Sequence, residues 1–260
     1  MTFDNLLIER DDAVAIVTLN RPKVLNALNS QTLTELARAM AAFKDDAGVR
    51  AIVLTGAGEK SFVAGADINE LAALSPVAGK EHARHGQQIF DAIEQLGKPV
   101  VAAINGFALG GGCELAMACT LRLAADTAKF GQPEINLGLI PGYAGSQRLP
   151  RLVGKGVALE ILLTGGMIGA QRAYEIGLVN RVVPAAELMA EAKKLAHALA
   201  SKAPIAVRYI LDAVHHGLDG AFAQGEYLET SLFGTIASSA DMREGTTAFL
   251  EKRKPVWQGK

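Results

Sequence analysis

Apolar residues follow two patterns along the chain: short continuous runs, and longer stretches in which they recur every three or four positions. The short runs predict buried strands, and the periodic stretches predict amphipathic helices. Over the first two thirds of the sequence the two patterns alternate, which is typical of an α/β core. The predicted strands occupy residues 13–19, 51–55, 100–104, 121–125 and 179–183.

Several helices have recognisable ends. One is predicted to begin near Ser30, and a longer one spans about residues 80–96, where Gly97 and Pro99 act as stop signals. Asp67 is placed to cap a short helix that follows it. These assignments put helices between the first three predicted strands.

The character of the chain changes near Pro184. From Ala185 to the end the pattern is almost wholly helical. We therefore predict an α/β core over residues 1–184 and an all-helical region over residues 185–260. The apolar stripes of the helical region show no obvious cover within the chain, so we expect the region to contact another subunit.

The candidate active-site segment follows the third predicted strand, residues 100–104. Gly110, Gly111 and Gly112 come at a predicted strand-to-helix turn, where the lack of Cβ atoms lets a ligand approach the backbone. The helical pattern begins at Cys113. The free N–H groups and positive dipole at a helix start favour an oxygen that carries or develops negative charge.

Two carboxylates accompany this turn. Glu114 lies just inside the predicted helix, and Glu134 lies in a later turn beside Pro133. Such a pair beside an anion-stabilising turn provides the parts for acid–base chemistry next to a carbonyl. Each part also has a structural interpretation, because acidic residues complement helix starts and glycine triplets mark tight turns. Periodicity does not show that the two carboxylates face each other.

Two other motifs are weaker. Gly56-Ala57-Gly58 follows a predicted strand, as in dinucleotide-binding folds, but the sixth position is Ser61 and no helix start follows. His82 and His85 are spaced to bind a metal, but no carboxylate or cysteine nearby completes a ligand set. We therefore expect neither a nicotinamide cofactor nor a metal site.

Composition and charge narrow the class of protein. The chain has 260 residues, 50% of them hydrophobic, and a net charge of −1, so no global field favours nucleic acid or an anionic membrane. No apolar run approaches the roughly 20 residues that span a bilayer. The first residues lack the pattern of a leader peptide, and Cys113 and Cys119 are not placed to pair with each other. A reducing, cytoplasmic setting is expected.

Taken together, the motifs resemble the enoyl-CoA hydratases of the crotonase family. The resemblance covers essentially the whole chain in order, and its motifs are specific for the family more than for one reaction. It is carried by residues 21–28, 62–68, 105–115, 133–134, 141–142 and 147–149 and by the ending at 244–255.

The resemblance implies a fold and a substrate. The expected fold is a spiral of repeated strand–strand–helix units with a C-terminal helical region that organises trimers, which pair into hexamers. The expected substrate is a coenzyme A thioester, and the reaction requires no metal or redox cofactor.

By position, the resemblance also assigns roles at the turn described above. The backbone N–H groups of Ala66 and Gly111 would hold the thioester oxygen. Glu134 would give and take the proton at Cα, and Glu114 would hold and activate the water that adds at Cβ. Gly142 would help place that water or the acyl chain.

Further positions of the resemblance would bind the substrate's coenzyme A. Phe249 and Lys252 match positions that reach the coenzyme from a neighbouring subunit. Asn69 and Tyr143 depart from common residues of the family, which bears on phosphate contact and on the size of the acyl pocket respectively. The residues expected along the pantetheine and adenine are Lys23, Val24, Leu25, Ala64, Ala66, Asp67 and Ile68.

Alternatives remain open within and beyond the family. Related enzymes isomerise, hydrolyse, decarboxylate or dehalogenate thioesters, but many lack one of the two glutamates that this chain keeps, which favours a hydratase or dehydratase. Some relatives also contact RNA. The near-zero net charge and 5% aromatic content give this chain little capacity for phosphate contact or stacking.

Overall fold

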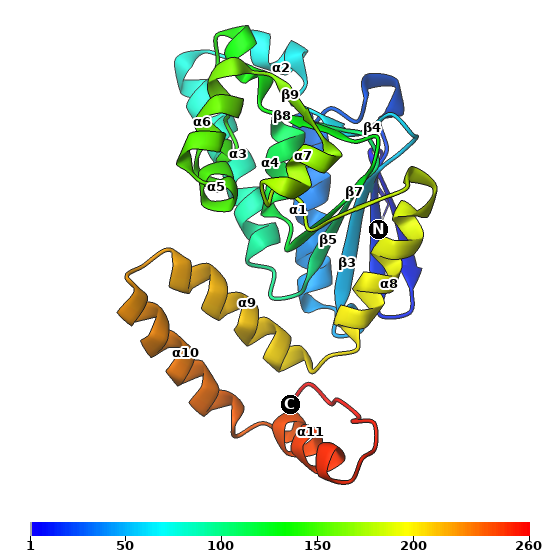
Figure 1. Ribbon diagram of the computed structural model, residues 1–260. Helices are drawn as coiled ribbons and strands as arrows, with labels where there is room; N and C mark the ends of the chain where they lie inside the picture. Colours follow the sequence, from blue (N-terminus) through cyan, green and yellow to red (C-terminus); the bar gives the residue numbers. More distant parts are fainter. Residues whose placement is uncertain (1) are drawn as a thin grey trace.

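The structure is a computed structural model that describes residues 2–260, and their strands form two sheets (Figure 1). The larger sheet has six strands in the order β1-β2-β3-β5-β7-β10, and the smaller has four in the order β4-β6-β8-β9. The strands are β1 (Leu6–Asp11), β2 (Val14–Leu19), β3 (Ala51–Gly56), β4 (Ser61–Ala64), β5 (Val100–Ile104), β6 (Phe107–Leu109), β7 (Leu121–Ala125), β8 (Lys129–Gly131), β9 (Met167–Gly169) and β10 (Arg181–Val183).

Both sheets are mainly parallel. In the larger sheet β1 pairs antiparallel with β2, and the pairs from β2 to β10 are parallel. In the smaller sheet β4, β6 and β8 are parallel, and β9 closes the edge antiparallel to β8. Parallel pairing requires a crossover between consecutive strands, and helices provide most of these crossovers.

The sheets are linked by a repeated unit. β3 passes directly into β4, β5 into β6 and β7 into β8, so that each pair contributes one strand to each sheet. Helical segments follow each pair. This arrangement confirms the expected spiral of strand–strand–helix units, and it brings the turns after β4, β6 and β8 to one side of the smaller sheet.

Helices surround the sheets (Figure 1). Asn29 caps the first helix through its side chain, and Asp67 caps the short helix after β4 as predicted. The helices are α1 (Ser30–Asp45), α2 (Ile68–Ala72), α3 (Pro76–Glu94), α4 (Gly111–Ala118), α5 (Gly145–Val153), α6 (Lys155–Thr164), α7 (Ala170–Glu175), α8 (Leu188–Ala200), α9 (Pro204–Leu218), α10 (Phe222–Ile236) and α11 (Ala240–Leu250), with 3-10 helices at Pro22–Val24, Pro133–Leu137 and Ala185–Glu187.

Both faces of the larger sheet are buried. Along β3, Ile52 and Leu54 face the main core, and Val53 between them faces a second core. The main core includes side chains of α1, α3 and α4 and of the smaller sheet. The second core is covered by α8, whose Leu188 and Ala192 are buried there. A strand covered on both sides needs a continuous apolar run, which explains the pattern that predicted β2, β3 and β5.

Some local predictions were wrong in detail. The glycine triplet does not follow β5 directly, because β6 intervenes and the triplet lies between β6 and α4. The helix after it begins at Gly111 rather than Cys113, and the helix expected at residues 80–96 begins at Pro76. Gly56-Ala57-Gly58 forms the tight turn from β3 to β4, where a Cβ on Gly56 would lie 2.3 Å from the carbonyl oxygen of Ser61.

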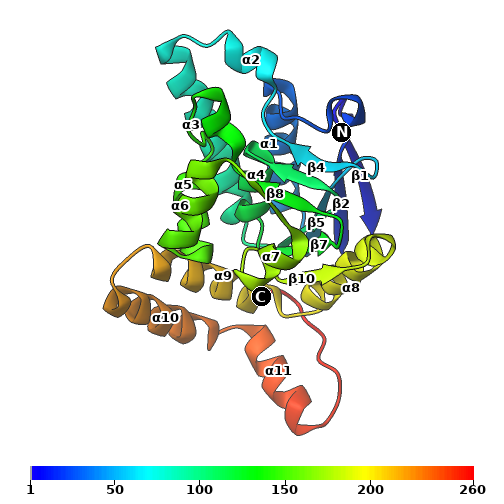
Figure 2. The ribbon, with the colours of Figure 1, turned by 45° about the horizontal axis from the view of Figure 1, so that its top comes forward.

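The helical region divides into two parts by its packing. α8 is buried against the larger sheet, whereas α9 and α10 form a hairpin that lies beside the core, and α11 extends from it (Figure 2). No residue of α9 or α10 is buried within the chain. Their exposed large apolar side chains include Ile210, Val214, Leu218, Phe222, Tyr227 and Phe233.

Among residues 2–260, no helix combines the length and the apolar composition needed to cross a membrane.

Candidate active site

Two backbone N–H groups from different repeats of the spiral come together at the start of α4. Gly110 precedes the helix with φ +50°, a conformation that favours glycine, and Gly111 is the first helical residue. Ala66 lies in the turn between β4 and α2. A Cβ built on Gly111 would lie 3.6 Å from the backbone nitrogen of Ala66, so the two peptides are adjacent. Neither N–H donates to another group within residues 2–260, and the pair can therefore bind an oxygen of a ligand.

Glu114 lies one turn into α4 and is fully buried. Its Oε1 accepts hydrogen bonds from the backbone N–H groups of Tyr143, at 2.8 Å, and Gly145, at 2.6 Å. Gly145 is the first residue of α5, so the carboxylate lies near the N-termini of two helices, where the dipoles favour negative charge. Because both bonds end on Oε1, Oε2 is the oxygen that can bind a further donor.

Burial controls the proton affinity of Glu114. The pKa of Glu114 is raised to about 8, chiefly by burial and next by the negative charge of Glu134. The two backbone hydrogen bonds and the positive charge of Arg148 act in the opposite direction. The pKa therefore lies near neutral pH, the range in which a carboxyl group can both accept and donate a proton during turnover.

Glu134 approaches the same turn from the 3-10 helix that follows β8. Its Oε1 lies 2.6 Å from the position that a Cβ on Gly110 would occupy, so a side chain at Gly110 would displace the carboxylate. Burial raises the pKa of Glu134. The structure thus brings Glu114, Glu134 and the adjacent N–H groups of Ala66 and Gly111 to one place, which periodicity alone did not show.

Gln132 is a buried residue of the site that sequence reasoning did not single out. With its amide nitrogen toward Glu134, it donates to both carboxylate oxygens at 3.1 Å. Its amide also lies 2.8 Å from the Cβ position of Gly145, whose N–H binds Glu114. Gln132 therefore fixes Glu134 next to the loop that holds Glu114. Its position two residues before Glu134 was the signal available in the sequence.

Tyr143 fills the space beside the two N–H groups. Its ring lies against Gly111 on one side and Gly86 of α3 on the other, and a Cβ on Gly86 would lie 2.2 Å from the ring. Its hydroxyl is 2.5 Å from Nε2 of His82, and burial lowers the pKa of His82. This tyrosine, which is fully buried, closes the site on the side of α3.

The residues expected along the coenzyme form an exposed rim near Ala66. The N–H of Ala64 donates to the carbonyl of Leu25, which joins the 3-10 helix carrying Lys23 and Val24 to the end of β4. Val24, Leu25 and Ile68 are large apolar side chains exposed to solvent. These side chains lie on the segments that position the N–H of Ala66.

Asp67 and Gly142 have partners within the chain. The Asp67 carboxylate pairs with Arg21 at 3.1 Å and caps α2, and these contacts account for its position without a ligand. The carbonyl of Gly142 accepts a hydrogen bond from the side chain of Gln87 at 2.9 Å. Gly142 immediately precedes Tyr143, whose N–H binds Glu114.

Phe249 and Lys252 lie at and just beyond the end of α11, which the views place away from α2 and α4 (Figures 1 and 2). Phe249 is 80% exposed. The structure does not bring these two residues to the site of their own chain.

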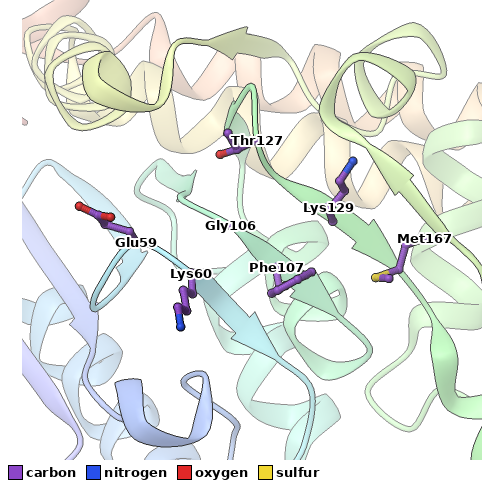
Figure 3. Close-up of a pocket in the computed structure, with 7 residues that line it drawn as sticks. All are labelled: Glu59, Lys60, Gly106, Phe107, Thr127, Lys129 and Met167. Carbon is purple, nitrogen blue, oxygen red and sulfur yellow. The ribbon is translucent and has the colours of Figure 1, made fainter.

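A surface hollow of about 540 Å³ lies along the smaller sheet, and neither the paired carboxylates nor any other expected site residue lines it (Figure 3). Its walls come from β6, β8, β9 and the turn before β4, and include Lys60, Phe107, Lys129 and Met167. Among residues 2–260, no three His, Cys, Asp or Glu side chains are grouped so as to hold a metal ion.

A two-sheet spiral that places a carboxylate pair beside free backbone N–H groups has the parts that acid–base chemistry next to a carbonyl requires. The sequence model of the enoyl-CoA hydratase/isomerase family matches residues 9–260. The chain belongs to this family.

Individual relatives match over nearly their whole length. The chain is 48% identical to the crotonyl-CoA hydratase of Syntrophomonas wolfei, over 98% of both chains. It is 47% identical to the short-chain-enoyl-CoA hydratase of Clostridium acetobutylicum, over 98% of this chain and 97% of that one. The crystal structure of an enoyl-CoA hydratase from Bacillus anthracis superposes with a TM-score of 0.95 at 40% identity, covering 99% of this chain and all of that chain.

Proposed function

We propose that the protein is an enoyl-CoA hydratase that adds water across the α,β double bond of short-chain 2-enoyl-CoA thioesters to give 3-hydroxyacyl-CoA. The type of enzyme follows from the family and from the relatives named as hydratases. The mechanism rests on one observation, the placement of Glu114 and Glu134 beside the adjacent N–H groups of Ala66 and Gly111.

In this mechanism the thioester oxygen accepts hydrogen bonds from Ala66 and Gly111. Water bound to Oε2 of Glu114 attacks Cβ, and the π electrons move toward the thioester oxygen to form an enolate. Since charge develops on that oxygen as the C–O bond forms, the two donors stabilise the transition state more than the substrate. One such donor is typically worth about 3–4 kcal/mol.

The protons balance between the two carboxylates. Glu114 takes the proton that the attacking water loses, and Glu134 delivers a proton to Cα of the enolate. Transfer of a proton from Glu114 to Glu134 restores the starting state of the enzyme. The net reaction adds one water to the thioester, with no gain or loss of protons by the enzyme. Burial holds the pKa of both groups above that of a free glutamic acid, which suits them to exchange protons near neutral pH.

The length of the acyl chain is proposed from the position of Tyr143. Its buried ring occupies the space between Gly111 and α3, next to the atoms that would bind the thioester. An acyl tail that extends well past Cβ in this direction would have to displace the ring and its hydrogen bond to His82. The names of the relatives from Syntrophomonas wolfei and Clostridium acetobutylicum, crotonyl- and short-chain-enoyl-CoA hydratase, support the same substrate class.

Hydration can be tested by running the reaction in ¹⁸O-labelled water. We expect crotonyl-CoA to lose its conjugated absorbance and the product to carry the label at Cβ. Along a series of enoyl-CoA esters of increasing length, kcat/KM should fall once the tail reaches Tyr143. If the double bond moves without incorporation of oxygen, the enzyme is an isomerase and the assignment as a hydratase is wrong.

We also propose that the chain assembles as a homohexamer of two trimers in which each coenzyme site is completed by a neighbour. The proposal is supported by the exposed apolar faces of α9 and α10 and by the position of α11, which carries Phe249, precedes Lys252 and lies away from α2 and α4 (Figure 1). Val24, Leu25 and Ile68 supply the exposed apolar rim that the neighbouring residues would cover.

Replacing Lys252 by Ala is then expected to raise KM for the coenzyme A ester and to reduce its dependence on salt, with kcat little changed. The reason is that a cation near the phosphates contributes to substrate binding and is screened by ions. Lys254→Ala, two residues on in the same exposed segment, is the matched control. Sedimentation measures the oligomeric state on which this prediction depends. A fully active monomer would contradict the proposed assembly.

A further inference from the structure

Both backbone polar groups of Tyr143 are held by side chains. Its N–H donates to Glu114 Oε1 at 2.8 Å, and the carbonyl oxygen of Tyr143 accepts from Nη1 of Arg148 at 3.2 Å. The next residue, Ala144, has φ +73°, so the loop adopts a backbone conformation that residues other than glycine rarely take. Surrounding contacts must maintain this conformation, because it costs free energy.

Arg148 is itself fixed in place. It lies in the first turn of α5, is buried, and donates to two acids of α3: to Asp91 at 2.6 Å and to Glu94 at 2.8 Å. The Asp91 and Glu94 side chains are 51% and 33% exposed, so they hold Arg148 from the solvent side while its guanidinium points inward. A guanidinium suits this position because its donors lie in one rigid plane.

We propose that Arg148 is a positioning residue for hydration: by binding the carbonyl oxygen of Tyr143 it fixes the loop whose N–H groups bind Glu114, and its charge favours the ionised carboxylate that activates water. The inference rests on the proposed role of Glu114. This role explains why Arg148 is buried, why a planar guanidinium is needed and how the strained loop is held. An ion pair needed only for stability could lie anywhere on α5.

The charges around the two residues support the direction of this effect. The positive charge of Arg148 lowers the pKa of Glu114, against burial and the charge of Glu134, which raise it. In turn, the hydrogen bonds and charges of Glu94 and Asp91 raise the pKa of Arg148 and keep it protonated. The other titratable groups near Glu114 are Cys113 of α4 and Tyr143. Those that line the same hollow as Arg148 are Cys119, which follows α4, and Arg122, Arg151, His215, His216 and Asp219.

The test compares two reactions that use different carboxylates. Hydration of crotonyl-CoA requires Glu114 and Glu134. Exchange of the Cα protons of butyryl-CoA in D₂O, a thioester with no double bond to hydrate, requires only Glu134 and the backbone donors. We expect Arg148→Met to lower kcat for hydration by about 10- to 100-fold, the range that misplacement of a catalytic group by a remote change can cause. The rate of Cα exchange should change by less than about threefold.

The pH dependence gives a second readout. Without Arg148 the ionised form of Glu114 loses a favourable charge, so its pKa rises and the acid limb of kcat for hydration moves to higher pH. Arg148→Lys keeps the charge but lacks the planar guanidinium, and should recover part of kcat and most of the pH profile. Arg151→Met is the matched control, because Arg151 lies on the same helix with its side chain 59% exposed.

The outcomes separate this inference from the proposed function. If the Glu114→Gln enzyme hydrates crotonyl-CoA at the wild-type rate, Glu114 is not the base and the proposed mechanism is wrong. A slow Glu114→Gln enzyme, together with an Arg148→Met enzyme that loses hydration and Cα exchange equally, would leave that role intact and overturn the role of Arg148. If Arg148→Met does not fold, Arg148→Lys decides by the same comparison: unchanged hydration, or an equal loss of both reactions, would overturn it.

Discussion

Glu134→Gln is expected to lower kcat for hydration by about 10²–10⁴-fold, because a positioned acid or base typically contributes that much. The amide cannot deliver a proton to Cα, although it keeps the size of the side chain and its place beside Gly110 and Gln132. Binding of the thioester should change little, since the N–H groups of Ala66 and Gly111 remain. Steady-state kinetics on crotonyl-CoA measure kcat and KM separately.

Glu114→Gln should give a loss of similar size for a different reason, since it removes the base that activates water. The two losses should combine less than additively, because both groups act on one water. Glu160→Gln, an exposed glutamate of α6, serves as the control and should be neutral. A Glu134→Gln enzyme that hydrates crotonyl-CoA near the wild-type rate would contradict the proposed mechanism.

The titration of Glu114 in the ligand-free enzyme adds an expectation with a definite sign. The charge of an ionised Glu134 raises the pKa of Glu114, so Glu134→Gln should lower that pKa. The ¹³C NMR titration of the Glu114 carboxyl should therefore move to lower pH. A shift to higher pH would mean that Glu134 does not bear a negative charge close to Glu114 in the free enzyme.

Gly112→Ala is expected to have the other large effect, on the fold around the site. A Cβ at this position would lie 2.0 Å from the carbonyl oxygen of Val63 in β4, and the backbone there cannot move aside as a flexible side chain could. Overpacking of this kind typically costs about 1–3 kcal/mol or more. Relief requires α4 to move away from β4, which separates the N–H of Gly111 from that of Ala66.

We therefore expect Gly112→Ala to lower the melting temperature and, in the folded fraction, to lower kcat by about 10²–10³-fold, as for loss of one oxyanion donor. Gly79→Ala is the control. Gly79 lies in α3 with no atom within 4 Å of the added Cβ, and alanine there should be neutral or slightly stabilising. A Gly112→Ala enzyme with wild-type melting and kcat would contradict this account of how α4 packs.

The sequence predicted the larger sheet better than the smaller one. β2, β3 and β5 are buried on both faces, so their apolar runs are continuous and easily recognised. β6 and β8 have three residues each, too few to establish any periodicity, and they pair only with each other and with neighbours of three or four residues. The glycine triplet was therefore placed one strand too early in the spiral.

The site was predictable where a residue's type indicates chemistry, and not where geometry alone gives it a role. Glu114 and Glu134 are carboxylates beside a helix start, and the resemblance to known enzymes added Ala66 and Gly111. Arg148 and Gln132 act through contacts with residues far away in the sequence, which only the folded chain brings together. The motif at residues 147–149 marked Arg148 as part of the family resemblance, but it gave no role that would separate Arg148 from the solvated Arg151 on the same helix.

The place of the α9–α10 hairpin near the end of the chain has a consequence for biosynthesis. Residues 2–200 contain both hydrophobic cores, so this part of the nascent chain can collapse before the hairpin leaves the ribosome. The hairpin and its exposed side chains, including Phe222 and Phe233, emerge after both cores and before α11. Under the proposed assembly, self-recognition thus becomes possible only after the catalytic part has formed, and the hazard of aggregation is confined to the interval between release of the chain and its meeting with partners.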